Sequence, residues 1–376
     1  PNKPHEGIAA WVSGFFGSGK SSFAKLLGLA IENRDIVGVG AARRFQDRLS
    51  DGRVKAHLTK ISEQIPTVAV IFDVSTDRGI RSSNQSLIEI MYRQLLQTLG
   101  YATDLDLAEL EINLEGEGRL DAFREAFQRA HDGLAWEKQR NLPAFAIGRA
   151  SAAMHALEPG TYPDAKAWQD SAIGRADITP GKLAERTRAL VERRHPGTAL
   201  IYVIDEVGQF ISRDVQKMLD LQAVVQSLGV TGRGRDWIVV TSQERLTEMV
   251  SGLDDKKIEL ARLMDRFKTQ VHLAQFDIAE VTSKRVLSKN SDAQRQLVAL
   301  FDAHRGALES ATRMAADVSL PSLSRDAFVQ LYPLLPYQIE LVIQIVSGLR
   351  TQEGATRHVG GANRTIIKLA QQLLIN

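Results

Sequence analysis

One octapeptide near the N-terminus constrains the fold more than any other feature: residues 14–21 read GFFGSGKS. An apolar run at 8–13 precedes it and an amphipathic run at 21–32 follows it, so it joins a buried strand to a helix. Glycines at this spacing let successive backbone N–H groups converge at a helix N-terminus, where they bind phosphate oxygens. The spacing G-x-x-x-x-G-K-S therefore predicts a phosphate-binding loop in a parallel α/β sheet.

Each side chain of this loop has an expected role. Lys20 adds a mobile positive charge for the phosphates, and the Ser21 hydroxyl is a ligand for Mg²⁺. The alternative, a glycine turn beside a surface lysine, does not account for the strand before the loop and the helix after it. The residues expected to bind ATP are Gly14, Gly17, Ser18, Gly19, Lys20, Ser21 and Ser22.

Four further apolar runs predict the rest of the sheet, at 67–74, 199–204, 237–241 and 270–273. The run at 199–204 leads directly into Asp205 and Glu206, at the strand end where an open α/β sheet binds its ligands. We expect Asp205 to hold Mg²⁺ and Glu206 to activate or orient the water that attacks the γ-phosphate. The alternative is that the two acids only begin a loop.

Three other positions are candidates for the catalytic site. The strand at 237–241 ends in polar residues, so either Thr241 or Ser242 is expected to position the attacking water. Arg266 comes just before the last strand, and Arg364 begins the final helical pattern. Each arginine side chain is suited to bind negatively charged phosphate oxygens. The alternative for each is a surface ion pair with an acidic side chain.

The segment at about 84–198 reads as a helical, loop-rich insertion between the second and third strands. Amphipathic patterns at 86–99 and 120–131 predict helices, and the acidic stretch at 104–117 between them is expected to be a solvated face. Prolines and glycines between 141 and 180 indicate loops, and Thr179-Pro180 predicts a helix start. Trp136 and Trp168 are expected to be packing anchors.

Two domains follow from these patterns: an α/β domain at 1–276, which includes the insertion, and a helical domain at 277–376. A helix is also expected at about 214–228, ended by Gly229. The chain opens on Pro1 without a methionine and stops at Asn376 just after an amphipathic run, so we expect a fragment of something longer.

Composition narrows the function classes. The 376 residues include no cysteine, which excludes disulfides, thiolate metal sites and cysteine nucleophiles, and fits a cytoplasmic protein. No apolar stretch is long enough to span a bilayer.

The formal charge of the chain is +2, so contact with a nucleic acid requires a local patch of basic residues. Basic residues gather at 43–60 without aromatic side chains among them, which favours a solvated helix face and leaves DNA contact as the alternative.

The order of these motifs resembles the AAA+ ATPases, particularly the origin-recognition and signal-transduction branch, over nearly the whole chain. This resemblance implies a sheet of strand order 5-1-4-3-2 with a C-terminal helical lid. It further implies that Ser242 is the first sensor, Arg266 an arginine finger that reaches a neighbouring subunit in a homo-oligomer, and Arg364 the second sensor. The insertion is larger than the one helix of a minimal AAA+ core, which leaves its role open.

The amino-acid sequence around the loop, from Pro4 to Lys25, resembles more specifically the BrxC/PglY family of P-loop proteins in BREX phage-defence systems. That resemblance implies a cytoplasmic ATPase working with a DNA methyltransferase and a phosphatase-like protein. Two functions stay open: an ATPase whose turnover drives remodelling of a protein–DNA assembly, and a nucleotide-gated scaffold that turns over rarely. A small-molecule kinase is disfavoured, because two acids at a strand end and a helical lid suit attack by water better than by a hydroxyl acceptor.

Overall fold

The structure is a computed structural model. It describes residues 7–14, 18–75, 86–172, 174, 178–211, 214–247, 263–273, 278–312, 321–351, 368, 370–372 and 374. Two residues of the expected site, Gly17 and Arg364, lie outside the described residues.

The chain divides into two compact units, which are described separately. The first comprises Pro1–Trp11, Ser21–Ser242 and Leu246–Gln270; the second comprises Val12–Lys20, Gln243–Arg245 and Val271–Asn376. This division falls at 270/271, six residues before the domain boundary expected from the sequence. It also assigns the segment 12–20 to the same unit as the C-terminal helices.

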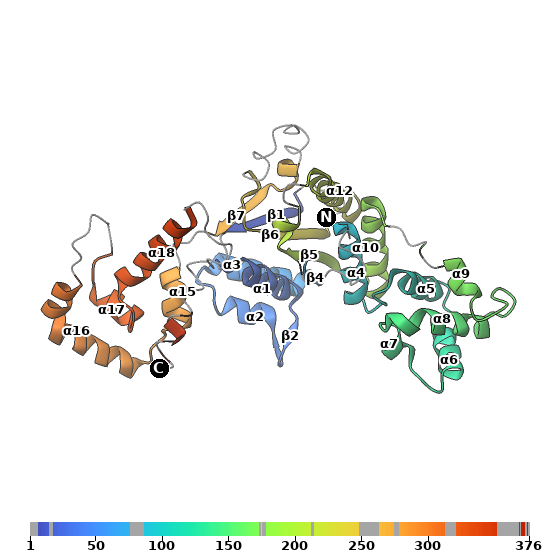
Figure 1. Cartoon of the computed structure of the whole chain (residues 1–376), viewed down its shortest axis with the longest axis horizontal. Coiled ribbons are helices and arrows are strands. Elements are labelled where there is room, and N and C mark those ends of the chain that lie inside the picture. The colour runs from blue at the N-terminus through green and yellow to red at the C-terminus, as the bar shows by residue number, and fades with distance from the viewer. Residues whose placement is uncertain are drawn as a thin grey trace. The chain divides into compact units, whose positions relative to one another are not determined.

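A five-stranded parallel sheet forms the centre of the fold (Figure 1). Its strands are β1 (Ala9–Gly14), β4 (Thr67–Asp73), β5 (Ala199–Asp205), β6 (Asp236–Ser242) and β7 (Thr269–Leu273). Each lies within one residue of the run expected from the sequence. The order across the sheet is β4-β5-β6-β1-β7, which counted along the chain reads 5-1-4-3-2 from the β7 edge. The expected parallel α/β class is confirmed.

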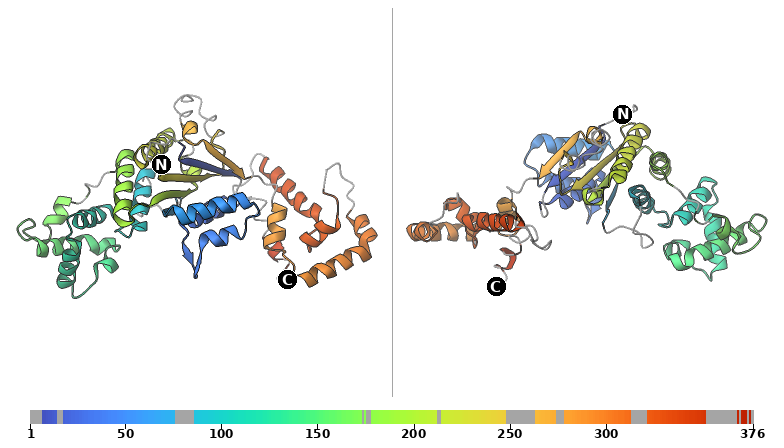
Figure 2. Two further views of the ribbon diagram at one scale, coloured as in Figure 1. Left: turned by 180° about the vertical axis from the view of Figure 1, so that it is seen from behind. Right: turned by 45° about the horizontal axis from the view of Figure 1, so that its top comes forward.

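Helices cover both faces of this sheet. Helix α1 (Lys20–Glu32) packs so closely that a Cβ on Gly28 would lie 2.9 Å from Val203 Cγ2. The next side chain back along β5, Tyr202, points to the opposite face and bonds Thr187 of α10 (Pro180–Arg194) at 3.0 Å. The three helices α4 (Leu87–Thr98), α10 and α12 (Val215–Gly232) contact one another on that face, as Figure 2 also shows.

A small hairpin and two helices connect α1 to β4. The hairpin consists of β2 (Asp35–Ile36) and β3 (Val39–Gly40), and it leads into α2 (Ala41–Gln46) and α3 (Gly52–Gln64). A buried cluster of Ala30, Ala42 and Leu58 joins the two helices to α1. Their apolar side is therefore used in packing, which leaves the other side to solvent.

The insertion contains more helix than expected. Besides α4 and α10 it contains α5 (Leu105–Gly116), α6 (Leu120–Ala130), α7 (Trp136–Gln139), α8 (Pro143–Leu157) and α9 (Ala167–Ala172), coloured teal to green in Figure 1. The region 141–180 was expected to be loop-rich, which is wrong for the fifteen residues of α8. Proline at a helix start costs nothing, and the small face Ala146, Ala150 and Ala153 is fully buried.

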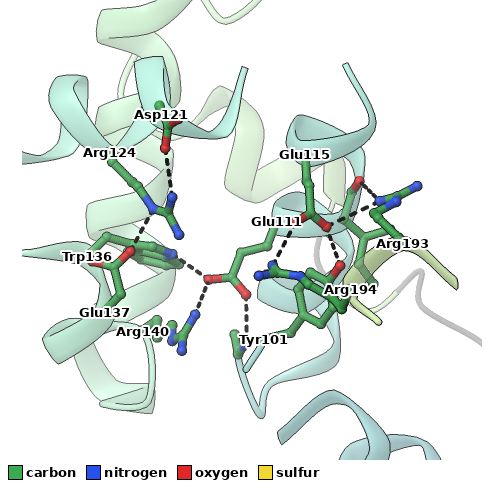
Figure 3. Close-up of polar contacts among 12 residues, drawn as sticks. Tyr101, Glu111, Glu115, Asp121, Arg124, Trp136, Glu137, Arg140, Arg193 and Arg194 are labelled. Carbon is green, nitrogen blue, oxygen red and sulfur yellow. Dashed lines mark hydrogen bonds and ion pairs between the residues drawn. The ribbon is translucent and has the colours of Figure 1, made fainter. Parts of the chain in front are cut away.

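The acidic stretch 104–117 is not a solvated face, contrary to the expectation. Its helix α5 buries Leu107, Ala108, Leu110, Glu111, Ile112 and Leu114. Glu111 is only 2% exposed, and its carboxylate accepts hydrogen bonds from Trp136 Nε1 at 2.6 Å, Ala102 N at 2.6 Å and Arg140 at 3.0 Å (Figure 3). Three donors compensate the buried charge, so a carboxylate at this position is compatible with the core. Trp136 and Trp168, 1% and 4% exposed, are packing anchors as expected.

Helix α12 runs past its expected end at Gly229 and stops at Gly232, followed by Arg233 in the left-handed region. Gly229 is buried inside the helix, whereas a Cβ on Gly232 would lie 2.4 Å from Asp236 Oδ2. The helix therefore ends at the left-handed Arg233, and the glycine before it leaves room for the Asp236 side chain. The start of α10 is confirmed, because Thr179 Oγ1 accepts a hydrogen bond from Lys182 N.

The second unit contains α15 (Ile278–Arg285), α16 (Ser291–Ala311), α17 (Arg325–Leu331) and α18 (Pro336–Thr351). Leu331 and Ile339 form the centre of a small apolar core there, with Ala279, Leu334 and Val342 around them. In the described part of the chain, no helix is both long and apolar enough to cross a membrane.

Candidate functional site

The loop after β1 requires glycine at its first position. A Cβ on Gly14 would lie 2.7 Å from the Leu273 carbonyl oxygen and 2.8 Å from Ser18 Oγ. Gly19 has φ +89°, a conformation that side-chain-bearing residues rarely adopt. The structure describes two glycines of the motif, Gly14 and Gly19. The backbone geometry of the loop requires glycine at both positions, as the sequence predicts.

Polar side chains follow at the start of α1. Lys20 is 8% exposed, Ser21 is half-buried and Ser22 is exposed. Ser18 Oγ is buried without a hydrogen-bond partner in the described part of the chain. A buried hydroxyl without a partner is uncommon in proteins, and an anion oxygen at this loop would satisfy it.

Asp205 is the buried acid of the site. Its side chain is 2% exposed, and Oδ1 accepts a 2.5 Å hydrogen bond from Thr241 Oγ1 on the adjacent strand β6. The other oxygen, Oδ2, lies 3.5 Å from Lys25 Nζ on α1. Both oxygens of this carboxylate therefore have partners from different elements.

Ser21 lies on the same side of α1 as Lys25, because residues four apart in a helix share a face. Since Lys25 reaches Asp205, the side of α1 that carries Ser21 is the side turned toward that carboxylate. The two expected Mg²⁺ ligands therefore come from elements in contact with each other. Mg²⁺ favours such a small set of protein oxygens, completed by phosphate oxygens and water.

Glu206 has a strained backbone, with φ at 59°. Left-handed backbone in a residue other than glycine costs free energy and requires support from its surroundings. The support here is a 2.9 Å hydrogen bond from Glu206 N–H to Thr241 Oγ1. Glu206 is half-buried, whereas Asp205 is buried.

Thr241 and Ser242 were equal candidates for positioning water, and their surroundings differ. The Thr241 hydroxyl is fully buried and is used twice, as donor to Asp205 and as acceptor from Glu206. Ser242 is 2% exposed and packs against the short helix α11 (Val207–Ile211). A Cβ on Gly208 would lie 1.9 Å from Ser242 Oγ, so only glycine fits beside that serine.

Arg266 is half-buried. Residues 263–266 form a helical turn, and the Arg266 guanidinium donates a 3.4 Å hydrogen bond to Gln226 on α12. Residues 248–262, just before this turn, lie outside the described residues. The finger role of Arg266 stays a prediction.

Sequence reasoning missed Lys25 and Gly208 as parts of this arrangement. Lys25 had a readable signal, since it follows Ser21 by four residues on a helix that begins at the loop. Gly208 had no such signal, because the need for glycine at this position of α11 comes from the Ser242 side chain on β6.

The described residues include no group of three or more His, Asp or Glu side chains able to hold a metal by themselves. Any Mg²⁺ here must therefore take ligands from a bound phosphate and water as well as from the protein. In the comparisons with known proteins, no family model matches the chain and no solved structure matches it.

Proposed function

We propose that this chain binds ATP with Mg²⁺ and hydrolyses it. The observation that carries the proposal is the contact between α1, the helix that begins at the GFFGSGKS loop, and the buried Asp205 that ends β5. A loop of this type needs an acid at a neighbouring strand end to bind the metal of a metal–nucleotide complex. Asp205, at 2% exposure and fixed by Thr241, has the position and rigidity for that role.

The proposal assigns each residue a role in phosphate binding, metal binding or hydrolysis. Backbone N–H groups of the loop, Lys20 and Ser18 Oγ bind phosphate oxygens, and Ser21 with Asp205 holds Mg²⁺. The metal neutralises charge that develops on the phosphate oxygens during transfer. Glu206 accepts a proton from the attacking water, or orients it, and Ser242 contacts the same region as a sensor. Arg266 of a neighbouring subunit and Arg364 add positive charge near the γ-phosphate.

The first test is calorimetric titration of MgATP into the wild-type chain and Lys20→Ala. We expect binding to be abolished in Lys20→Ala and unchanged in Lys138→Ala, a matched change of an exposed lysine. Unchanged ATP affinity in Lys20→Ala would reject the loop as the nucleotide site.

The second test separates binding from chemistry. Glu206→Gln keeps the size of the side chain but removes its basicity, so the variant is expected to bind MgATP normally and to cleave it far more slowly. Wild-type phosphate release by this variant would reject Glu206 as the catalytic carboxylate and leave ATP binding intact.

A nucleotide-gated scaffold is the second candidate, and the Lys25–Asp205 pair favours it. Mg²⁺ must compete with Lys25 for the carboxylate, which suits a protein that changes state on binding and turns over rarely. Steady-state phosphate release with and without DNA distinguishes the two. Sustained turnover supports a motor, and tight binding with negligible turnover supports a switch.

We further propose that the ATPase is of the AAA+ type and acts as a homo-oligomer in a BREX-type assembly. The support is the order of motifs along the chain together with the sheet order 5-1-4-3-2. The partners would be a DNA methyltransferase and a phosphatase-like protein. Co-purification of tagged versions of these proteins with this chain tests the assembly, and their failure to associate would leave only the ATPase proposal.

A further inference from the structure

The segment from Arg34 to Gln64 carries more net charge than the whole chain. It contains seven Lys or Arg and four Asp or Glu residues, a net of +3, against +2 for all 376 residues. The rest of the protein is therefore slightly acidic, and this segment is the exception. It lies in the first unit and comprises the β2–β3 hairpin, α2 and α3.

The cations of this segment lie on the solvent side of the two helices. Arg53, His57 and Lys60 follow one another at i, i+4 and i+7 on α3 and are all exposed, whereas Leu58 faces the buried cluster. On α2, Arg43 and Arg44 are exposed while Ala41 and Ala42 are buried. Gln46 of α2 bonds Thr59 of α3 at 2.8 Å, so the two helices that carry these cations contact each other.

Three of these cationic side chains have no hydrogen-bond or ion-pair partner in the described part of the chain. They are those of Arg43, Arg48 and Lys60. By contrast, two of the nearby acids are occupied: Asp35 accepts from Gly38 N, and Asp51 caps α3 by accepting from Arg53 N and Val54 N. Asp51 also lies 3.5 Å from the Arg53 guanidinium. With seven basic and four acidic residues, the segment keeps a net positive charge of +3, which is suited to an anionic partner.

The hairpin beside α2 adds a second observation. Val37 at its tip has φ 53°, an outlier for a β-branched residue, and its side chain is 90% exposed. Arg44 Nη2 donates to the Ile36 carbonyl at 2.8 Å, which ties this tip to the basic helix. Strained backbone that exposes an apolar side chain is costly for folding, so it points to use in binding.

We propose that the surface formed by Arg43, Arg48, Arg53 and Lys60, with the hairpin tip at Val37, binds the phosphate backbone of duplex DNA. Arginine predominates in the segment, and its planar fork matches phosphate oxygens. Single strands bind mainly by base stacking, which this surface lacks because it exposes no aromatic side chain. A membrane is disfavoured because the apolar side of the helices is buried against α1 and cannot enter lipid.

The test is fluorescence anisotropy of a labelled 30-base-pair duplex without nucleotide, titrated with the 376-residue chain between 50 and 200 mM NaCl. We expect the wild type to bind and the triple variant Arg43→Ala, Arg48→Ala, Lys60→Ala to bind about tenfold or more weakly at 100 mM salt. The slope of log affinity against log salt should become shallower by about 2 to 3, because each lost phosphate contact removes about 0.9.

The matched control removes three exposed cations that are already paired: Lys284, Arg295 and Arg305, which contact Glu280, Asp292 and Glu309. This variant is expected to bind DNA as the wild type does. Lys20→Ala should also keep wild-type DNA binding, so failure of the ATP proposal does not affect this test. No binding by the wild type at 50 mM salt, or an unchanged salt slope in the triple variant, overturns the proposal.

Sedimentation with phosphatidylserine vesicles separates DNA from lipid. If the triple variant loses vesicle binding while its duplex affinity equals that of the wild type, the surface serves a membrane and the proposal is wrong. Equal thermal unfolding of the wild type and the triple variant is expected, because the three side chains are exposed and make no hydrogen bond or ion pair in the described part of the chain.

Discussion

Thr241 donates a 2.5 Å hydrogen bond to Asp205 from the neighbouring strand, so the carboxylate proposed to hold Mg²⁺ is oriented by β6 and not by its own strand. The same hydroxyl accepts from the backbone of Glu206. One buried side chain thus fixes both acids.

Replacing Thr241 by valine keeps the shape and removes both hydrogen bonds. We expect the free energy of unfolding to fall by about 1–3 kcal/mol, because Asp205 and Glu206 N–H each lose a buried partner. ATP hydrolysis should fall more than MgATP affinity. Thr241→Ser retains the hydroxyl and should stay close to wild type in urea unfolding and in phosphate release. Equal losses in the serine and valine variants would show that the methyl group, not the hydroxyl, matters.

Removing Lys25 should change the Mg²⁺ requirement. In Lys25→Met this ammonium group no longer competes for Asp205 Oδ2, so we expect half-maximal binding of a fluorescent ATP analogue at lower Mg²⁺ concentration than in the wild type. Lys25→Arg keeps the charge and should behave as the wild type. A higher Mg²⁺ requirement in Lys25→Met would mean that Lys25 assists metal binding.

Arg266 can be tested by complementation between subunits. An arginine finger stabilises charge on the γ-phosphate during transfer and is worth several orders of magnitude in rate. Arg266→Ala and Lys20→Ala are each expected to be inactive alone. Their mixture should recover phosphate release, because the intact finger of the second completes the intact pocket of the first. If mixed oligomers form and stay inactive, Arg266 does not act across an interface, and its contact with Gln226 is then its structural role.

Asp236 predicts a pH dependence of stability. Burial raises its carboxyl pKa to about 6, although Arg188 lies 2.7 Å away and lowers it in part. Between pH 4 and 6 the folded state keeps a proton that the unfolded state has lost, so stability falls as pH rises through this window. Asp236→Asn removes this contribution. The stability of the wild type relative to Asp236→Asn should be lower at pH 7 than at pH 4.5 by about 1–3 kcal/mol.

Urea unfolding of both proteins at the two pH values measures this difference, and groups common to both cancel. A difference that does not change between pH 4.5 and 7 would mean that the Arg188 pair keeps Asp236 ionised throughout.

Glu111 should be critical for the insertion. Glu111→Ala leaves Trp136 Nε1, Ala102 N–H and Arg140 without their acceptor, so we expect a loss of about 3–5 kcal/mol in unfolding free energy. Glu111→Gln keeps one acceptor oxygen and should lose less. Limited proteolysis should cut the alanine variant first within 101–172. Wild-type protease resistance in Glu111→Ala would indicate that these donors find other partners.

Local signals sufficed for the sheet but not for everything around the site. The five strands are short runs rich in apolar or β-branched residues, and β1 and β5 lead directly into glycine or acidic residues, so their positions could be read to within one residue. Glycine at 14 and 19 was likewise predictable, since the loop geometry is local. The orienting role of Thr241 was not, because it depends on which strand lies beside β5.

The acidic helix α5 was misread for a related reason. Its charge pattern alone indicates a solvated face, yet Tyr92 and Arg186 bond Glu109, and Arg194 pairs with Glu115. Partners that lie ten to eighty residues away convert an exposed-looking helix into a buried one. No local pattern records such long-range pairing.

The parallel pairing of β4 with β5 has a consequence for how this protein could have acquired its insertion. All seven residue pairs from Thr67–Ala199 to Asp73–Asp205 are in register, although residues 74–198 separate the strands. A connection about ten times longer than the dozen residues a parallel crossover needs raises the entropy cost of closure by only about 2 kcal/mol. Because α4 and α10 pack on the sheet together with α12, the helices between α4 and α10 could be exchanged in evolution while Asp205 kept its neighbours.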